Sequence, residues 1–320
     1  MEFVARTAPI ETRKVCSYHG RVATSLDIAS TYDYLDEFWR VSLADADDIT
    51  CARYRGDFTK TLEIAQREKH EFILSSLRLR EGHRLLDIGC GWGGLMREAV
   101  RRGITAHGLT LSPRQAHHCR SLGLDVELRS WSAITAEPAF DGIAAVGSFE
   151  HFCSEGDYRL GRQEEIYRQF FSVARAALRP RCRLYLQTMT WGRRMPQPER
   201  MSVTEPFGSD GFIVGALKQF YPGSWLPLGQ EMIASTAAEW FRVISIESGR
   251  LDYIETIKQW NRRLLRPSLA KLRTGVRAAC ALLSEGPNRY KLLSIIRSYN
   301  RECFRREIMD HYRMVLECKE

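Results

Sequence analysis

The chain has 320 residues, which fits one large α/β domain with an insertion or two small domains. Apolar residues make up 44% of it and charged residues 27%, an ordinary globular composition that argues against disorder. Nine cysteines, with no C-x-x-C pair, exclude a simple disulfide framework and predict reduced thiols in a cytoplasmic protein. No apolar run approaches the ~18 residues of a membrane-spanning helix, and the N-terminus lacks the apolar core of a signal peptide.

Positive charge is concentrated near the C-terminus. The formal charge is +8, and the stretch 253–313 alone holds 14 Lys and Arg against five acidic residues. A basic amphipathic face of this kind suits an anionic membrane surface, while an ordinary solvated helix face is the alternative. The apolar residues at helical spacing in this stretch are Leu264, Leu265, Leu269, Leu272 and Val276.

The first half of the chain predicts an alternation of strands and helices. Residues 1–58 are irregular and are predicted to form an N-terminal lid segment, and apolar spacing over 59–80 predicts a helix with one buried side. Strand–helix alternation of this kind predicts parallel strands joined by right-handed crossovers. The expected strands are 83–90, 104–111, 125–131, 141–149 and 183–190, and the expected helices are 94–102, 112–122 and 158–178.

The pattern changes after residue 190. Residues 191–230 hold five prolines and six glycines, too long a stretch for a simple loop, and they predict a cap insertion over the strand ends. Strands at 240–247 and 314–318, with helices over 253–306, complete the expectation. The prediction is an α/β fold: a doubly wound, mainly parallel, seven-stranded Rossmann-like sheet. Its predicted divisions are the lid 1–58, a core 59–190, the cap 191–230, and the rest of the core with the basic segment, 231–320.

The strongest local signal is the motif LLDIGCGWGG at 85–94, which follows a strand and opens a helix. Glycines at 89, 91 and 93 allow a sharp turn and let a ligand approach the main chain. The spacing G-x-G-x-G disfavours a pyrophosphate-binding turn, for which G-x-G-x-x-G is typical. Asp87, just before the first glycine, is typical of S-adenosylmethionine sites. The motif therefore predicts that this cofactor binds here.

Several motifs in the same order and spacing resemble one family, the cyclopropane fatty-acid synthases and mycolic-acid cyclopropane synthases, which are S-adenosylmethionine-dependent methyltransferases. The resemblance covers roughly residue 32 to the C-terminus, and it implies that Trp131 lies against the adenine, where stacking is favourable. It also implies cofactor contacts by Thr50, Gly89, Gly91, Thr110 and Gln115. The motifs are YDYLDEFWR, DDITCARY, LLDIGCGWGG, GLTLSPRQ, VGSFEHF and YPGSWLP.

The resemblance also implies a chemistry: methylation of a carbon–carbon double bond through a carbocation that then loses a proton. In the family a bound bicarbonate is the base. The residues that bind it correspond here to Cys51, Glu150 and Tyr253, and Gln187 stands in place of the family histidine. Gln187 can donate a hydrogen bond but carries no charge, so bicarbonate binding stays an open question. Cys51 is expected to act through its main chain. His151 is either a second base or a packing residue.

The function predicted from the sequence is methylation of a carbon–carbon double bond in an unsaturated lipid acyl chain, giving a cyclopropane or a methyl branch. The alternative is a natural-product methyltransferase that acts on a soluble isoprenoid or an amine. The expected partners are this lipid or isoprenoid substrate and an anionic membrane, which the cytoplasmic protein would join peripherally. No nucleic-acid partner is expected, because SFEHF replaces the (N/D/S)PP(Y/F) turn of many nucleic-acid methyltransferases, and no metal is expected.

Overall fold

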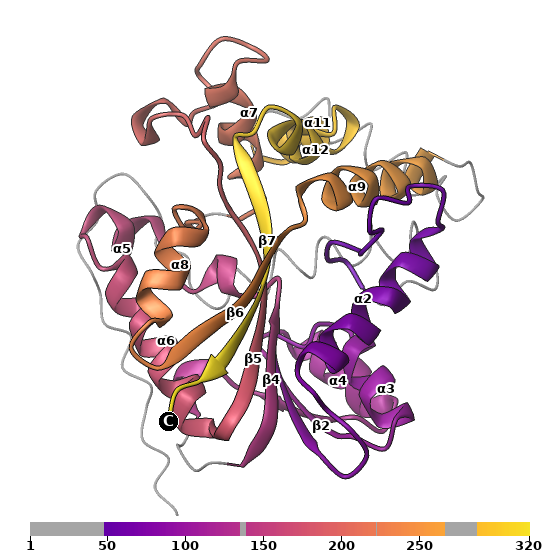
Figure 1. Ribbon diagram of the computed structural model, residues 1–320. Helices are drawn as coiled ribbons and strands as arrows, with labels where there is room; N and C mark the ends of the chain where they lie inside the picture. The colour runs from indigo at the N-terminus through magenta and orange to yellow at the C-terminus, as the bar shows by residue number, and fades with distance from the viewer. Residues whose placement is uncertain (1–47, 135–138, 222, 266–286) are drawn as a thin grey trace, which may run out of the picture.

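One seven-stranded sheet forms the centre of the computed structural model, which describes residues 48–134, 139–221, 223–265 and 287–320 (Figure 1). Its strand order is β3-β2-β1-β4-β5-β7-β6. The first five strands pair in parallel, and β7 is antiparallel to both β5 and β6. The predicted α/β fold with a mainly parallel, doubly wound sheet is therefore confirmed. The strands are β1 (Arg84–Ile88), β2 (Thr105–Thr110), β3 (Asp125–Leu128), β4 (Phe140–Val146), β5 (Leu178–Trp191), β6 (Phe241–Ser248) and β7 (Met309–Cys318).

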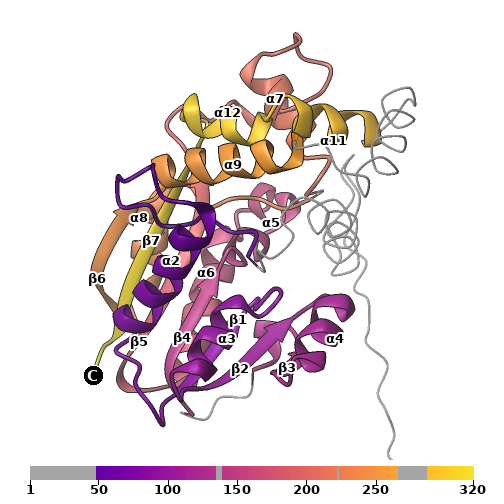
Figure 2. The same ribbon diagram turned by 90° about the vertical axis from the view of Figure 1, so that its right-hand side faces the viewer.

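Helices cover both faces of the sheet and its upper edge (Figures 1 and 2). One face carries α2 (Leu62–Ser76), α3 (Gly94–Arg101) and α4 (Pro113–Ser121). The other face carries α5 (Glu155–Arg159), α6 (Gln163–Ala177) and α8 (Gly229–Ala237). Above the carboxyl ends of the parallel strands lie α7 (Asp210–Leu217), α9 (Arg250–Leu265), α11 (Pro287–Ile296) and α12 (Tyr299–Arg305). Short 3-10 turns are η1 (Trp131–Ala133), η2 (Phe149–His151) and η3 (Pro198–Arg200).

Local sequence explains where these helices begin. The Ser112 hydroxyl caps α4 by accepting a hydrogen bond from the Gln115 main chain, and Pro113 fits the first turn because its missing N–H is not needed there. Ser154 and Asp157 form a capping box at the start of α5. The predicted single helix 158–178 is consequently wrong: it is two helices, separated at Gly161, which has a φ of +70°.

Some predicted boundaries also differ. The third strand ends at Leu128 rather than at residue 131, because Trp131 begins η1. The last strand begins at Met309 rather than at 314, so residues 309–313 belong to the sheet. Ile64 belongs to the apolar set that predicts α2, but it is 41% exposed and lies off the buried side.

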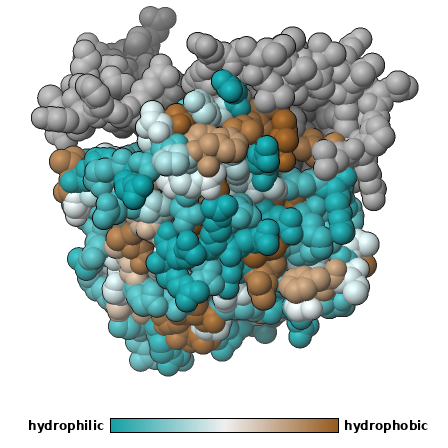
Figure 3. Space-filling model, turned by 90° about the horizontal axis from the view of Figure 1, so that it is seen from above, coloured by the Kyte–Doolittle hydropathy of each residue, from teal (hydrophilic) through white to brown (hydrophobic). Residues whose placement is uncertain are grey.

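The predicted lid lies largely outside the described residues, and the predicted basic segment lies partly outside them. Of residues 1–58, only 48–58 are described, and Leu269, Leu272 and Val276 fall in the gap at 266–286. The division of the chain into lid, core, cap and remainder stays a prediction. Seen from above, the surface carries apolar patches among larger hydrophilic areas (Figure 3). Within the described ranges, no helix has the length and apolarity needed to cross a membrane.

Candidate active site

The turn between β1 and α3 is bound to the end of β2. The N–H groups of Gly89 and Cys90 both donate to the Leu109 carbonyl, at 2.8 and 2.9 Å. Gly89 and Gly91 have φ angles of +80° and +55°, which favour glycine. A Cβ on Gly89 would lie 2.5 Å from Cβ of Ser148, whereas a Cβ on Gly91 would meet no atom within 4 Å. Packing therefore requires glycine at position 89, while Gly91 opens onto free space.

A cavity of about 340 Å³, here called the main cavity, lies against this turn. An adjoining space of about 50 Å³ is lined by Asp87 and shares Gly91 with the main cavity. All seven predicted cofactor residues thus come together around two adjoining spaces at the carboxyl ends of the strands. Those that line the main cavity are Thr50, Gly89, Gly91, Thr110, Gln115 and Trp131.

The main cavity has a polar wall and an aromatic wall. Thr110 Oγ1 donates to Gln115 Oε1 at 2.7 Å, which ties the end of β2 to the start of α4. The Trp131 ring centroid is 5.2 Å from that of Phe152 and 5.5 Å from that of Phe170. A flat aromatic wall beside hydroxyl and amide groups fits a purine nucleoside, because adenine stacks on rings and its ribose forms hydrogen bonds.

A buried charged cluster, absent from the sequence-based predictions, adjoins Asp87. Lys69 of α2 is fully buried, pairs with Asp48 and donates to Thr50 Oγ1 at 2.7 Å. His70 Nε2 lies 2.8 Å from the same Asp48 carboxylate. Burial alone would raise the pKa of Asp48, but the charge of Lys69 and the hydrogen bonds and charge of its neighbour His70 together outweigh burial and hold that pKa well below its usual range. The cluster therefore fastens the Asp48–Thr50 segment, which forms part of the main cavity wall, to α2.

Asp87 itself is buried at the end of β1. Burial raises the pKa of Asp87 to about 7, and the negative charge of Asp48 adds to this rise while Lys69 opposes it. A cationic amino group bound beside Asp87 would favour its ionised form. The acid therefore fits the amino-acid end of S-adenosylmethionine, as the aromatic wall fits the adenosine end.

Glu150, in the η2 turn after β4, is 3% exposed. Its Oε1 accepts a hydrogen bond from the Met189 main chain at 3.0 Å, while its buried Oε2 has no hydrogen-bond partner among the described residues. Burial raises the pKa of Glu150 to about 7, against the lowering effect of the Met189 hydrogen bond. An unsatisfied buried carboxylate oxygen is costly, so this oxygen is an available acceptor for a cationic or proton-donating ligand.

Glu150 lines a second, mostly apolar cavity of about 60 Å³, here called the inner chamber. His151 lines both the inner chamber and the main cavity, so the two spaces share a wall. His151 Nδ1 lies 3.0 Å from the Ser224 hydroxyl, and burial lowers the pKa of His151 to about 4. His151 is therefore neutral at physiological pH and is bonded within the wall.

The structure joins Cys51 and Gln187. Gln187 Nε2 donates to the Cys51 carbonyl at 3.0 Å, and Gln187 Oε1 accepts from the Tyr185 hydroxyl at 3.2 Å. Burial raises the pKa of the Cys51 thiol to about 12, so the thiol stays protonated, in agreement with the expectation that it is no nucleophile. Both ends of the Gln187 amide are thus engaged by protein groups.

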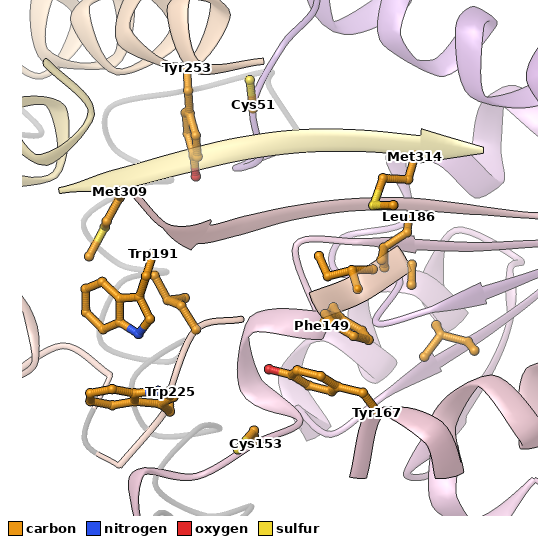
Figure 4. Packing of buried hydrophobic residues seen from close by; sticks show 14 of the residues in the cluster. Cys51, Phe149, Cys153, Tyr167, Leu186, Trp191, Trp225, Tyr253, Met309 and Met314 are labelled. Carbon is orange, nitrogen blue, oxygen red and sulfur yellow. The ribbon is translucent and has the colours of Figure 1, made fainter. Parts of the chain in front are cut away.

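Tyr253 projects from α9 toward β7, where its ring centroid is 5.1 Å from that of His311 (Figure 4). His311 lies directly opposite Met189 in the β5–β7 ladder, and Met189 is the residue whose N–H binds Glu150. Tyr253, from α9, and Glu150, from η2, therefore both contact the Met189–His311 pair of the β5–β7 ladder. His311 is buried, and its Nδ1 has no hydrogen-bond partner among the described residues. It is a buried histidine that the sequence-based predictions missed.

Arg313 was also missed, because it counted only as one charge of the predicted basic segment. It is 1% exposed, lies 2.9 Å from Asp252 and 3.1 Å from Glu247, and donates to the Ala52 carbonyl at 2.7 Å. The inclusion of Arg313 in a membrane-facing charged surface is therefore wrong. The position of Arg313 among the apolar residues of the last strand could have indicated that its charge is buried.

Comparisons with known proteins identify the family of the chain. The family model described as mycolic acid cyclopropane synthetase matches residues 20–275. The chain is 31% identical to cyclopropane mycolic acid synthase 3 of Mycobacterium tuberculosis over 73% of this chain and 80% of that protein. Among solved structures, the cyclopropane synthase MmaA2 from Mycobacterium tuberculosis superposes with a TM-score of 0.70, at 26% identity over 92% of this chain and 99% of that one.

A second similar structure is that of mycolic acid cyclopropane synthase CmaA1 complexed with SAH and CTAB. It has a TM-score of 0.71 and 28% identity, over 93% of this chain and 99% of that one. The resemblance inferred from the motifs is thereby confirmed. The chain therefore belongs to the mycolic acid cyclopropane synthetase family and is an S-adenosylmethionine-dependent methyltransferase.

Proposed function

We propose that the protein methylates a carbon–carbon double bond of an unsaturated lipid acyl chain. The observation that carries this proposal is the free, buried oxygen of Glu150, which lies in an apolar chamber that shares the His151 wall with the main cavity. An alkene is a weak nucleophile, and its attack leaves a carbocation. Among the described residues no cation forms an ion pair with Glu150, and a buried carboxylate of this kind supports that charge.

S-adenosylmethionine, when bound, supplies the electrophilic methyl group. The Gly91 turn and the Trp131 wall would hold the cofactor, and the apolar chamber would hold the alkene and exclude water. Glu150 Oε2 would then face the positive charge and accept the proton that the cation loses. A pKa of about 7 suits this role, because it makes Glu150 ionisable at neutral pH and still basic enough to take a proton.

Bicarbonate, the base implied by the family resemblance, does not fit Gln187. The Gln187 side chain carries no charge, and one of the two N–H groups of its amide already donates to the Cys51 carbonyl. We therefore assign proton uptake to Glu150 and route no step through bicarbonate. Whether the proton leaves the new methyl group decides between a cyclopropane and a methyl branch, and both products remain within the proposal.

The alternative acceptor is a soluble isoprenoid or an amine. Two observations favour it: Gln187 replaces the family histidine, and the inner chamber is small, at about 60 Å³. Peripheral association with an anionic membrane belongs to the lipid proposal alone. Its structural support is limited to exposed apolar side chains on or beside the upper helical layer, namely Phe207, Leu251 and Ile296.

Mass spectrometry of lipids tests the proposal. Cells that express the wild-type protein should accumulate acyl chains heavier by one CH₂ group, and cells that express Glu150→Gln should not. Unchanged lipids in the wild-type cells, together with methyl transfer to a small isoprenoid or amine in vitro, would favour the alternative acceptor. A modified lipid pool in the Glu150→Gln cells would contradict the role given to Glu150.

A further inference from the structure

Three cavities adjoin in sequence, and each neighbouring pair shares one lining residue. His151 divides the main cavity from the inner chamber. Trp191, the last residue of β5, lines both the inner chamber and a groove of about 560 Å³, here called the outer groove. The outer groove is polar, with Arg193, Arg250 and Glu307 among its lining residues. Trp191 is therefore part of the wall between the chamber that contains Glu150 and the outer groove.

Trp191 is held firmly in this place. Its main-chain N–H donates to the Pro227 carbonyl at 2.8 Å, and it pairs with Met309 across the β5–β7 ladder. Its ring lies between Met309 and Trp225 (Figure 4), with centroids 5.2 Å apart for the two tryptophans. Trp225 is itself fully buried and stacks on Tyr158 at 4.2 Å. The wall is thus backed by a row of aromatic rings.

The size of the inner chamber limits what fits behind this wall. One water-sized group needs roughly 10–15 Å³ of such space, so about 60 Å³ holds about four to six non-hydrogen atoms. A long acyl chain that passes Glu150 would need more room than this. Toward the outer groove, such a chain would have to continue through the position of the Trp191 ring.

We propose that Trp191 is the residue that sets acceptor length: it ends the inner chamber and restricts the apolar segment beyond Glu150 to about five carbons. This length limit applies to the acceptor of the proposed methyl transfer, and it therefore rests on the proposed function. Acceptors with a compact unsaturated end, such as a prenyl group or a double bond close to the chain terminus, fit this chamber. Removing the ring would join the inner chamber to the outer groove and admit a longer chain.

Calorimetric titration with saturated n-alcohols of increasing length tests the proposal without turnover, on the full chain saturated with S-adenosylmethionine. For the wild-type protein, affinity should stop rising at about five or six carbons. For Trp191→Ala, affinity should continue to rise for the further CH₂ groups that fill the space left by the indole ring, by up to about threefold to fourfold for each group that is fully buried there. Met309→Ala is the matched control, because Met309 lines the inner chamber but not the outer groove, and its plateau should stay within one or two carbons of the wild type.

Trp191→Leu serves as a second variant if Trp191→Ala does not fold, and wild-type cofactor affinity verifies either variant. A wild-type affinity that rises steadily to twelve carbons would overturn the proposal, as would a variant that reaches its plateau at the wild-type length. Methyl transfer is measured separately. If chain-length binding behaves as expected but no acceptor is methylated, the proposed function fails while the length limit stands.

Discussion

Gln187 and Arg313 lie directly opposite each other on β5 and β7, and both bind the main chain of the segment that begins at Cys51. Gln187 donates to the Cys51 carbonyl at 3.0 Å, and Arg313 donates to the Ala52 carbonyl at 2.7 Å. One amide and one guanidinium thus fasten a single loop to the centre of the sheet. The same loop supplies Thr50 to the main cavity, so the two strands also position part of the cofactor site.

Arg313→Ala should destabilise the fold by about 3–5 kcal/mol, because it leaves the acids Asp252 and Glu247 and the Ala52 carbonyl without their buried partner. Arg242→Ala is the control: Arg242 pairs with Glu317 on the surface and should contribute no more than about 1 kcal/mol. Urea unfolding measures both variants. Equal midpoints for the two variants would show that the Arg313 network contributes little.

Gly91→Ala should weaken S-adenosylmethionine binding by about tenfold or more, because the added methyl points into the space beside the turn. Gly123→Ala is a matched control, since both glycines have positive φ and a Cβ on either would meet nothing within 4 Å. Both substitutions should cost about 1–2 kcal/mol of stability through backbone strain. Calorimetry that gives both variants the same cofactor affinity would remove Gly91 from the binding site.

Glu150 should make stability pH-dependent in the cofactor-free protein. Its folded pKa, about 7, lies above the ordinary value of 4.5, so the folded state disfavours the ionised form. Stability is therefore lost as pH rises from about 4.5 to about 7, by roughly 3 kcal/mol in total. Glu150→Gln cannot ionise, so its melting temperature relative to the wild type should be higher at pH 8 than at pH 5. A difference that is the same at both pH values would mean that Glu150 is not a buried, destabilised acid.

The basic C-terminal segment should favour anionic membranes. Each exposed Lys or Arg near such a surface contributes about 1 kcal/mol, and salt weakens the attraction. The protein should therefore sediment with vesicles that contain anionic lipid, and the bound fraction should fall as salt is raised. Equal binding to neutral vesicles, unaffected by salt, would rule out an electrostatic association.

Local patterns predicted the glycine turn after β1 and the mainly parallel sheet well, because glycine spacing and strand–helix alternation depend on neighbouring residues. The partners of Gln187 were not predictable, since the Tyr185 hydroxyl and the Cys51 carbonyl reach it only in the folded sheet. Lys69 lies on the buried side of α2, seven residues after Leu62. A lysine among the apolar residues of that side could have indicated a buried ion pair. Arg313 was misjudged because a count of charges over a segment does not show which of them enters a strand.

The central claim is that Glu150 supports the cation and takes its proton. The most direct measurement is the rate of methyl transfer by Glu150→Gln, under saturating S-adenosylmethionine, to the acceptor that lipid analysis identifies. The substitution keeps the side chain's shape and should leave cofactor affinity near the wild-type value, while turnover falls by about 100-fold or more. Glu165→Gln, which changes an exposed glutamate on α6, is the control and should retain full activity. Wild-type turnover by Glu150→Gln would contradict the account.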